Sequence, residues 1–525
     1  MSPREKQSFY LTTPIYYVNS VPHLGTAYTT VAADTLARYR RMRGDDVWFL
    51  TGLDEHGQKV AEAAQRADKD PQAWVDEIAI QFKEAWRMLD ISNDQFIRTT
   101  DQMHVDAVRK LAQELYDKGD IYRGTYDGWY CVPDEAFWNE GELTEKSDDG
   151  DWLCPDCHRP VKYVEEDNYF FKLSAYEDAL LEWYARDPEC IGPQTRYNEV
   201  VSFVKSGLRD LSISRANVAW GIPLPWDESQ TIYVWLDALS NYITAIGYGD
   251  EARADEFARR WPTQIHFVGK DIIRFHCVYW PAFLMAAGLP LPEKVYAHGF
   301  LLAKGEKMSK SKGNAQTPAE LVDRFGVDGF RYYFLRDVVF GQDGSISMES
   351  MVQRYNGDLA NDWGNLVSRL FNMVDKYCDG EVPDPTVYDD ESEGARLREI
   401  AATLPDCVEH HMAALNYSGA LDAIWELVKE ANRYLEESAP WALAADEQTI
   451  ARMRAVLYNA LEAVRIVALF CAPTMPHTSA EVFRRLSLGA IAEVDDLHEA
   501  VKWGGLSVGN AVAKGEPLFP RILEE

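Results

Sequence analysis

The first fifty residues carry the apolar pattern of a β-α-β unit. Residues 8–13 are predicted as a strand that Pro14 stops, and residues 25–42 have the apolar period of a helix. Gly44 follows this helix as a C-cap would, and residues 47–50 form a second, short strand. Two strands joined in this way by a helix are the building unit of a doubly wound α/β sheet.

The same order of elements recurs downstream. Residues 265–268 are predicted as a strand, a helical and aromatic-rich stretch then runs to Gly288, and residues 295–298 form a further strand. We therefore expect two halves of one parallel, Rossmann-like sheet.

From about residue 353 the apolar period becomes helical. Two stripes show it most clearly: Leu421, Ile424, Val428, Ala431 and Leu435, and then Val456, Ala460, Val464, Val467 and Cys471. This pattern predicts a bundle of helices, interrupted by an acidic surface loop over residues 379–393.

Two polar loops follow predicted strands. The first, residues 23–26, reads His-Leu-Gly-Thr at a strand-to-helix turn, where the N-terminus of a helix attracts anions. The second, residues 307–311, reads Lys-Met-Ser-Lys-Ser and lies between glycines, so its amides can approach a ligand. Lysines suit the charge that develops on a phosphate. Either loop alone could be a solvated turn. Together, at the switch point of one sheet, they indicate a nucleoside triphosphate site.

Composition narrows the class of protein. The chain has 525 residues, 46% of them hydrophobic, which is enough for roughly two to four domains. Its 84 acidic and 53 basic residues give a net charge of −31, so a nucleic acid would have to bind at local positive patches. The acidity by itself indicates solubility. Residues 1–7 are polar, and no long apolar run follows, so we expect a cytoplasmic protein with no membrane partner.

The two loops together resemble the signature pair of the class I aminoacyl-tRNA synthetases. Four other stretches are similar to the methionyl-tRNA synthetases, and the similarity runs from residue 8 to about 480. These stretches are residues 13–19, 51–57, 233–239 and 269–276. One departure is visible, because Thr26 stands where the signature usually has a second histidine.

The resemblance implies a methionine–tRNA ligase. Such an enzyme activates methionine with ATP and Mg²⁺ to methionyl-adenylate, and then transfers methionine to the terminal adenosine of tRNA(Met), including initiator tRNA. The methionine carboxylate attacks the α-phosphorus, so positioning and charge stabilisation supply the rate. By resemblance, His23, Lys307 and Lys310 are the catalytic residues. The implied ATP site comprises His23, Gly25, Thr26, Lys270, Asp271, Lys307, Met308, Ser309, Lys310 and Ser311.

The methionine side chain is apolar and polarisable, so its pocket should be aromatic and closely fitting. The family's pocket positions fall on Ile15, Tyr17, Asp54, Trp235, Ala238, Leu239, Tyr242, Ile272, His276 and Trp280. Asp54 would bind the ammonium group of the substrate. Several of these residues have helical spacing, so the alternative is an ordinary helix core in which His276 is a satisfied core histidine.

The eight cysteines are scattered, which fits a reducing compartment. Cys154-x2-Cys157 is half of a zinc knuckle, and Cys131 is the third cysteine of this region. The resemblance implies one structural Zn²⁺ bound by Cys131, Asp134, Cys154 and Cys157, with His158 as another possible ligand. The alternative is a knuckle that has lost its metal.

The family reads the anticodon on its helix bundle, and the implied contacts are Asn361, Asn365, Arg369, Pro440 and Trp441. The first three follow i, i+4, i+8, on one face of a helix. Arginine reads base edges and tryptophan stacks on splayed bases, although Trp441 could instead be a core residue.

The expected division is a catalytic domain over 1–119 and 226–352, a connective insertion with the knuckle over 120–225, and a helical anticodon-binding domain over 353–525. We expect a monomer, because the chain ends soon after the bundle. The alternatives are a class I synthetase for leucine, isoleucine, valine or cysteine, a nucleotidylyltransferase, and a catalytically silent tRNA- or zinc-dependent binding module. The insertion is too short for the editing domain of the first three synthetases, and the bundle argues against the nucleotidylyltransferase.

Overall fold

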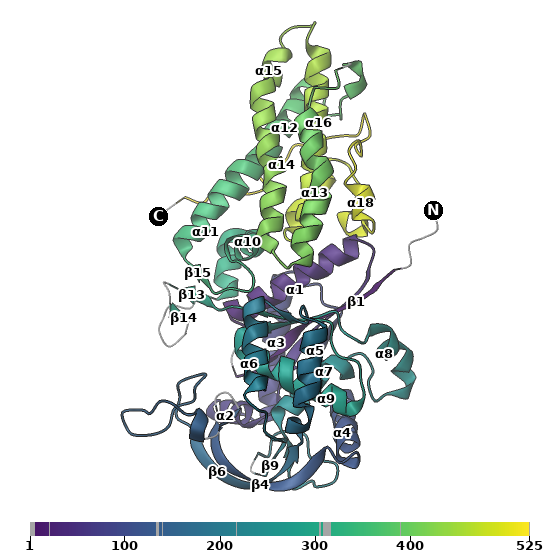
Figure 1. The fold of residues 1–525 in the computed structure, drawn as a ribbon. Coiled ribbons are helices and arrows are strands. Elements are labelled where there is room, and N and C mark those ends of the chain that lie inside the picture. Colours follow the sequence, from purple (N-terminus) through teal and green to yellow (C-terminus); the bar gives the residue numbers. More distant parts are fainter. Residues whose placement is uncertain are drawn as a thin grey trace.

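The computed structural model describes residues 6–19, 21–132, 136–138, 140–216, 218–303, 306–307, 317–388 and 390–523. A sheet covered by helices lies in the middle, a long curved hairpin extends from one end of it, and a helix bundle stands on the other (Figure 1). Within these ranges no helix is both long and apolar enough to cross a membrane.

The central sheet has six strands, all parallel, in the order β3-β2-β1-β11-β12-β7. Their bounds are β1 (Ser8–Tyr17), β2 (Asp46–Asp54), β3 (Gln95–Arg98), β7 (Ile191–Gly192), β11 (Ile265–Gly269) and β12 (Val295–His298). The order runs outward from β1 through β2 to β3 and from β11 to β12, whereas the edge strand β7 comes from earlier in the chain than β11. The predicted doubly wound sheet is confirmed, with its switch point between β1 and β11. The helices that follow the first strands are α1 (Leu24–Met42), α2 (Gln58–Arg66), α3 (Pro71–Met88) and α4 (Gln102–Asp117).

Strand β1 does not stop at Pro14, and that prediction was wrong. The strand continues to Tyr17, and its pairing with β2 shifts register between Thr12 and Ile15. A proline lacks the N–H that a regular ladder needs, and a register shift is where a strand can accommodate one.

The aromatic-rich stretch after β11 is helical, but it is made of three kinds of helix. A 3₁₀ turn (Lys270–Ile272) leads to a π-helical turn (η5, Phe275–Tyr279) and then to α9 (Trp280–Ala287). Gly288 ends α9 in the left-handed conformation, with φ of 73°.

The insertion is built on a hairpin of β4 (Ile121–Cys131) and β6 (Lys162–Phe171), which pair antiparallel along ten residue pairs. Strands β5 (Ala136–Trp138) and β8 (Leu211–Ser212) complete this sheet. The segment also contains α5 (Glu177–Arg186), α6 (Gln194–Lys205) and β9 (Ser214–Arg215), which pairs with β10 (Thr231–Ile232). Helices α7 (Val234–Thr244) and α8 (Ala254–Arg260) then lead back to β11.

A second small sheet follows β12. Strand β13 (Leu301–Ala303) pairs antiparallel with β14 (Glu306–Lys307) and parallel with β15 (Gly344–Ile346). Helix α10 (Pro318–Asp337) lies between β14 and β15 in the sequence and bends at Gly326, whose φ is 70°.

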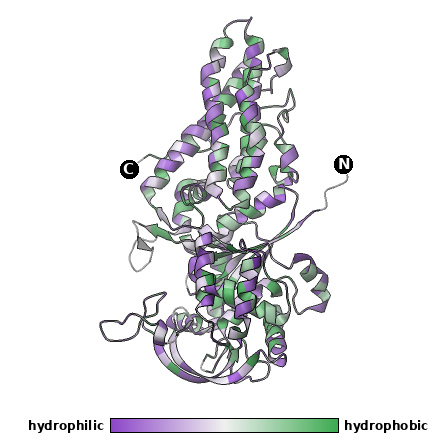
Figure 2. Ribbon diagram, in the orientation of Figure 1, coloured by the Kyte–Doolittle hydropathy of each residue, from purple (hydrophilic) through white to green (hydrophobic). Residues whose placement is uncertain are grey.

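The predicted helix bundle is confirmed, and every residue of its two apolar stripes is buried. Its helices are α11 (Met348–Arg354), the π-helix η7 (Tyr355–Gly364), α12 (Asn365–Tyr377), α13 (Ala395–Ala413), α14 (Tyr417–Ser438), α15 (Pro440–Leu443), α16 (Ile450–Cys471), α17 (Pro476–Arg485) and α18 (Leu497–Ala500). Hydrophobic and hydrophilic residues alternate along these helices (Figure 2), as expected when one face of each packs inward.

One arginine joins the sheet to the bundle. Arg331 of α10 is fully buried, and its guanidinium donates to the Asp34 carboxylate of α1 at 2.6 Å. It also donates to the backbone carbonyls of Pro473 and Thr474, both at 2.9 Å, in the turn before α17. The hydroxyl of Tyr417 donates to Ala32 O at 2.8 Å. Helix α1 is therefore held directly by the bundle.

Candidate functional site

The N-terminus of α1 is capped by His23. Its Nδ1 accepts the backbone N–H groups of Gly25 and Thr26, at 3.1 and 3.3 Å. In a neutral imidazole the proton is then on Nε2, which makes that atom the hydrogen-bond donor of the exposed ring. A Cβ on Gly25 would lie 3.0 Å from His23 Cε1, so this position favours glycine.

Thr26 completes the cap. Its hydroxyl accepts the backbone N–H of His23 at 3.0 Å and donates to His23 O at 2.7 Å. The residue that departs from the family signature therefore closes the first turn of α1 and fixes the loop that carries His23.

The two halves of the sheet meet beside this cap. His298, the last residue of β12, donates from Nδ1 to Gly299 O at 2.8 Å, and its Nε2 faces the Thr29 hydroxyl of α1 at 2.6 Å. Burial lowers the pKa of His298, which keeps the ring neutral. The hairpin of β13 and β14 begins three residues later, so it extends from the same edge of the sheet as His23.

The second polar loop is only partly described. The backbone of Lys307 pairs with Leu302 in the β13–β14 hairpin. The side chain of Lys307 and the whole of Met308, Ser309, Lys310 and Ser311 lie outside the described residues.

Lys270 and Asp271, which directly follow β11, are described. Asp271 is exposed, whereas the ammonium of Lys270 lies 2.7 Å from both oxygens of Asp343.

The predicted methionine residues converge from several elements. Trp235, Ala238, Leu239 and Tyr242 are buried on α7, and His276 and Trp280 are buried on η5 and α9. Ile15 and Tyr17, both half-buried, end β1. Asp54, which is 2% exposed, ends β2 opposite Tyr17. Ile272 is half-buried on the 3₁₀ turn.

Two contacts join these elements. The Tyr242 hydroxyl lies 2.7 Å from His276 Nε2, and His276 Nδ1 lies 3.0 Å from Ile272 O. The ring therefore donates from Nδ1 and accepts from Tyr242. Burial lowers the pKa of His276 to about 4, so the imidazole is neutral at pH 7. His276 is thus a satisfied buried histidine, in contact with Tyr242, which is another of the predicted pocket positions.

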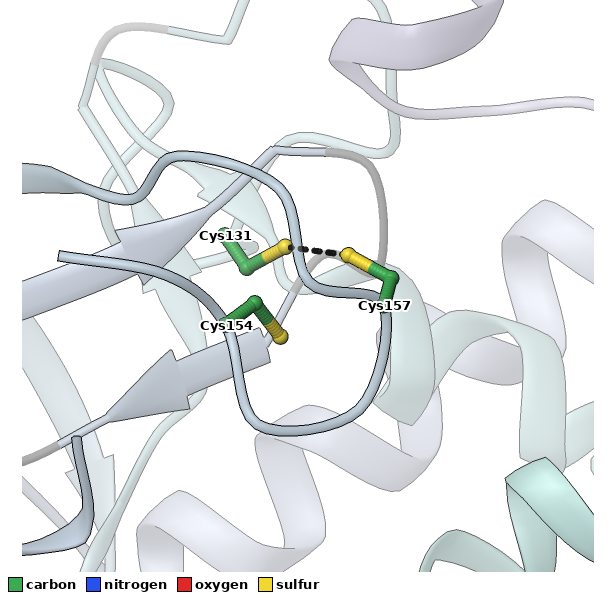
Figure 3. A group of neighbouring side chains, drawn as sticks. All are labelled: Cys131, Cys154 and Cys157. Atoms are coloured by element: carbon green, nitrogen blue, oxygen red, sulfur yellow. Dashed lines mark hydrogen bonds between the residues drawn. The ribbon is translucent and has the colours of Figure 1, made fainter. Parts of the chain in front are cut away.

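Three cysteine sulfurs cluster at the tip of the insertion (Figure 3). The Sγ atoms of Cys131, Cys154 and Cys157 all lie within 4.8 Å of one another, and those of Cys131 and Cys157 are 3.6 Å apart. Tetrahedral zinc with bonds of about 2.3 Å to sulfur needs sulfurs about 3.8 Å apart, so the spacing fits this ion. Asp134 lies outside the described residues. His158, whose side chain is 64% exposed, points to Glu145 at 3.1 Å and not to the sulfurs.

The predicted anticodon residues lie on η7, α12 and α15. Asn361 and Asn365 are exposed, and Arg369 pairs with Glu436 of α14 at 3.6 Å. Pro440 is buried at the start of α15, whereas Trp441 is 47% exposed. The interpretation of Trp441 as a core residue was therefore wrong. Glu436 precedes Trp441 by five residues, so Arg369 and Trp441 lie at the same end of the bundle.

Comparisons with known proteins agree on one family. Residues 9–371 match the family of class I (M) tRNA synthetases, and residues 382–525 match the anticodon binding domain of methionyl tRNA ligase. The chain is 50% identical over 517 residues to the methionine–tRNA ligase of Caldanaerobacter subterraneus, covering 98% of this chain and 79% of that protein. It is 47% identical to the methionine–tRNA ligase of Streptomyces coelicolor, covering 99% and 98%. The chain belongs to the methionyl-tRNA synthetase family.

Solved structures of this family have the same fold. The Mycobacterium tuberculosis methionyl-tRNA synthetase in complex with methionyl-adenylate is 44% identical, with a TM-score of 0.94 over 98% of this chain and 100% of that one. The apo form of that protein gives a TM-score of 0.86, at 40% identity and full coverage of both chains.

Membership in the methionyl-tRNA synthetases confirms the predicted enzyme class. The chain is an ATP-dependent methionine–tRNA ligase, with methionine, ATP and tRNA as its substrates. The alternatives of a synthetase for another amino acid, a nucleotidylyltransferase and a silent binding module are set aside.

Sequence reasoning did not single out several residues that contact the predicted site residues or lie on the same elements. Phe275 stacks on Trp235, with ring centres 3.6 Å apart and planes at 5°. Asp237 of α7 lies 2.7 Å from both His56 and His104. Burial acts to raise the pKa of Asp237, but its contacts with these two histidines lower it to about 2. Phe275, Asp237 and His56 all lie inside stretches that resemble the family, so the signal was present. Nothing local marks His104, which reaches Asp237 only in the fold.

Proposed function

We propose that ATP binds at the carboxyl edge of the central sheet, between the start of α1 and the small sheet of β13, β14 and β15. One observation carries this assignment. Strands β1, β2, β11 and β12 end at this edge. The two signature loops come after β1 and β12 in the sequence, and the family-like stretches 51–57 and 269–276 include the ends of β2 and β11. In open α/β sheets a ligand binds outside the carboxyl ends of the strands, at the switch point.

The residues at this edge have the chemistry that adenylate formation needs. The methionine carboxylate attacks the α-phosphorus of ATP, the bond to the bridging oxygen breaks, and pyrophosphate leaves. His23 would donate from Nε2 to the triphosphate, and the open position at Gly25 would admit the nucleotide. Lys270, Lys307 and Lys310 would stabilise the charge of the departing phosphates. Mg²⁺ would neutralise part of the charge on the triphosphate.

Methionine would occupy the pocket between the ends of β1 and β2, α7 and η5. Asp54 is the one acidic residue among the predicted pocket positions, so it would receive the substrate ammonium. The neutral His276 and the aromatic rings of Trp235, Tyr242 and Trp280 would surround the thioether, for which polarisable neighbours are favourable.

The cysteine cluster would hold one structural zinc ion. Cys131, Cys154 and Cys157 would supply three thiolates, and Asp134 is the proposed fourth ligand. A small apolar group that includes Trp138, Leu143 and Val161 packs around the buried cysteines. Such a group is small for a stable core, so the ion would contribute to the folding of this lobe.

The bundle would bind the anticodon. Asn361, Asn365 and Arg369 would read base edges, and Trp441, next to Pro440, would stack on a base. We retain the division into a catalytic domain (1–119 and 226–352), a connective insertion (120–225) and an anticodon-binding domain (353–525). Both steps would take place in the cytoplasm, where tRNA is charged.

Methionine-dependent ATP–pyrophosphate exchange, run beside leucine, isoleucine, valine and cysteine, tests the pocket assignment. Exchange with methionine alone is expected, and exchange with another amino acid would contradict the pocket.

Lys307→Ala tests the second loop. We expect adenylate formation to slow by about 100-fold or more, because a group that stabilises the leaving phosphates is lost, while methionine affinity is unchanged. Lys294→Ala is the matched control, because Lys294 precedes β12 at the opposite edge of the sheet. Weaker methionine binding with an unchanged rate would refute the role of Lys307.

A further inference from the structure

Lys270 is held by two groups of the small sheet that carries the second loop. Its ammonium lies 2.7 Å from both carboxylate oxygens of Asp343 and 4.3 Å from the centre of the Phe300 ring. Phe300 directly precedes β13 and Asp343 directly precedes β15, whereas Lys270 directly follows β11. The ion pair therefore joins the edge of the central sheet to the small sheet.

Asp343 has a fixed position that does not depend on Lys270. Its Oδ1 accepts the backbone N–H of Phe300 at 2.8 Å, and the N–H of Gly344 donates to Phe300 O at 2.9 Å. The two segments touch at Gly299, where a Cβ would lie only 2.3 Å from the carbonyl carbon of Gln342. The flexible lysine side chain therefore adapts to the carboxylate, and not the reverse.

The carboxylate of Asp343 is ionised at neutral pH. Burial acts to raise its pKa, but the hydrogen bonds from Lys270 and from the Phe300 N–H lower it below its ordinary value. The side chains of Lys270 and Asp343 are 21% and 40% exposed, so water weakens their pairing. The ion pair is therefore open enough for an incoming phosphate to approach the Lys270 amine.

We propose that Asp343 is a positioning residue for adenylate formation, which holds the Lys270 ammonium at the nucleotide edge of the sheet. An ammonium has three N–H donors, and with two directed at Asp343 the third remains for a phosphate oxygen. The inference rests on the proposed role of Lys270 in ATP binding. Asp343 directly precedes β15, and Lys307, the first residue of the second loop, ends β14 of the same small sheet.

A double-mutant cycle tests the proposal. Asp343→Asn removes the charge but keeps an oxygen that can accept the Phe300 N–H, so the contact between β13 and β15 is retained. We expect the rate of adenylate formation at saturating ATP to fall about tenfold or more, with methionine affinity unchanged, since a misplaced charged group costs rate. Asp343→Glu should restore part of the rate.

The second half of the cycle uses Lys270→Gln, alone and with Asp343→Asn. If Asp343 acts through Lys270, Asp343→Asn has no further effect once the lysine is gone. An equal loss in both backgrounds, or no loss in either, would overturn the proposal. If Lys270→Gln itself leaves exchange unchanged, the proposed ATP role of Lys270 fails instead.

The control variant is Asp375→Asn in the bundle. Asp375 pairs with Lys514 at the same distance, 2.7 Å, and its side chain is 43% exposed. Loss of this pair is expected to leave adenylate formation at the wild-type rate, and a loss equal to that of Asp343→Asn would count against a specific role for Asp343.

Discussion

At the scale of single residues, Thr26 shows that a signature position can change while its geometry is kept. A threonine supplies only a neutral hydroxyl where the family usually has an imidazole, yet that hydroxyl makes both bonds of the cap with the backbone of His23. The orientation of His23 therefore depends on a residue that the sequence marked only as a departure.

Thr26→Val should destabilise the protein by about 1 kcal/mol, because valine has the same shape and no capping hydroxyl. It should also slow methionine-dependent pyrophosphate exchange severalfold by loosening His23. Thr26→Ser, which keeps the hydroxyl, is the control. Thermal unfolding and exchange assays measure both effects, and equal behaviour of the two variants would show that the cap is not needed.

His276 gives the fold a defined pH dependence. Its pKa is about 4 in the folded protein and about 6.5 in an unfolded chain. The unfolded state therefore binds the extra proton first, so stability is present above pH 6.5 and is lost as pH falls from about 6.5 toward about 4.

His276→Gln should remove this titration. Between pH 7 and pH 5 the variant should lose about 2 kcal/mol less unfolding free energy than the wild type does. Urea denaturation at the two pH values measures the difference. An identical pH dependence in the two proteins would mean that His276 is protonated in the fold.

At the scale of elements, most strands and helices could be predicted, and the irregular ones could not. The spacing of apolar residues predicted helix α1, strand β12 and the buried faces of helices α14 and α16. The continuation of β1 past Pro14 and the π-turn at η5 were missed, because each depends on tertiary partners. Strand β2 lies beside the register shift, and Trp235 of α7 stacks on Phe275. A π-turn inside a helix is frequent at functional sites.

The sequence did not indicate the form of the helices that carry three of the predicted pocket positions. Ile272, His276 and Trp280 were placed on one face by a regular spacing, yet they belong to a 3₁₀ turn, a π-turn and an α-helix. Their predicted role in the pocket came from the resemblance to the family, because the spacing of residues says nothing about which ligand they would contact. The functional assignments of all the site residues stay predictions, and Met308, Ser309, Lys310, Ser311, Asp134 and the side chain of Lys307 also lie outside the described residues.

The zinc site predicted in the insertion, at Cys131, Cys154 and Cys157, can be tested by metal content. Native protein should contain close to one zinc ion per chain, and Cys154→Ser should lower that content and expose the lobe to proteolysis, because a thiolate ligand is lost. Elemental analysis and limited digestion measure this. A metal-free preparation that is folded and fully active would contradict a structural zinc.

At the scale of the whole molecule, the protein and its tRNA substrate both carry a negative net charge. A net charge of −31 repels tRNA at long range, so binding must come from local contacts, of which Trp441 is the most exposed aromatic candidate in the bundle.

Trp441→Ala should leave methionine-dependent pyrophosphate exchange unchanged and lower kcat/KM for tRNA charging by about 10- to 100-fold, the value of one stacked base. Trp441→Phe should retain much of the activity because a ring remains. Loss of exchange as well as charging would point to a folding role.

The buried Arg331 bears on how this enzyme could be recombined with its relatives. Its guanidinium takes its counter-ion from α1 and its carbonyl acceptors from the turn before α17. A chimera that joins this catalytic half to a foreign bundle would leave buried donors without acceptors unless the new turn supplied them, at about 1–3 kcal/mol for each. The catalytic half and the bundle are therefore matched to each other. A domain exchange between relatives has to keep Arg331 together with the turn before α17 that supplies its carbonyl acceptors.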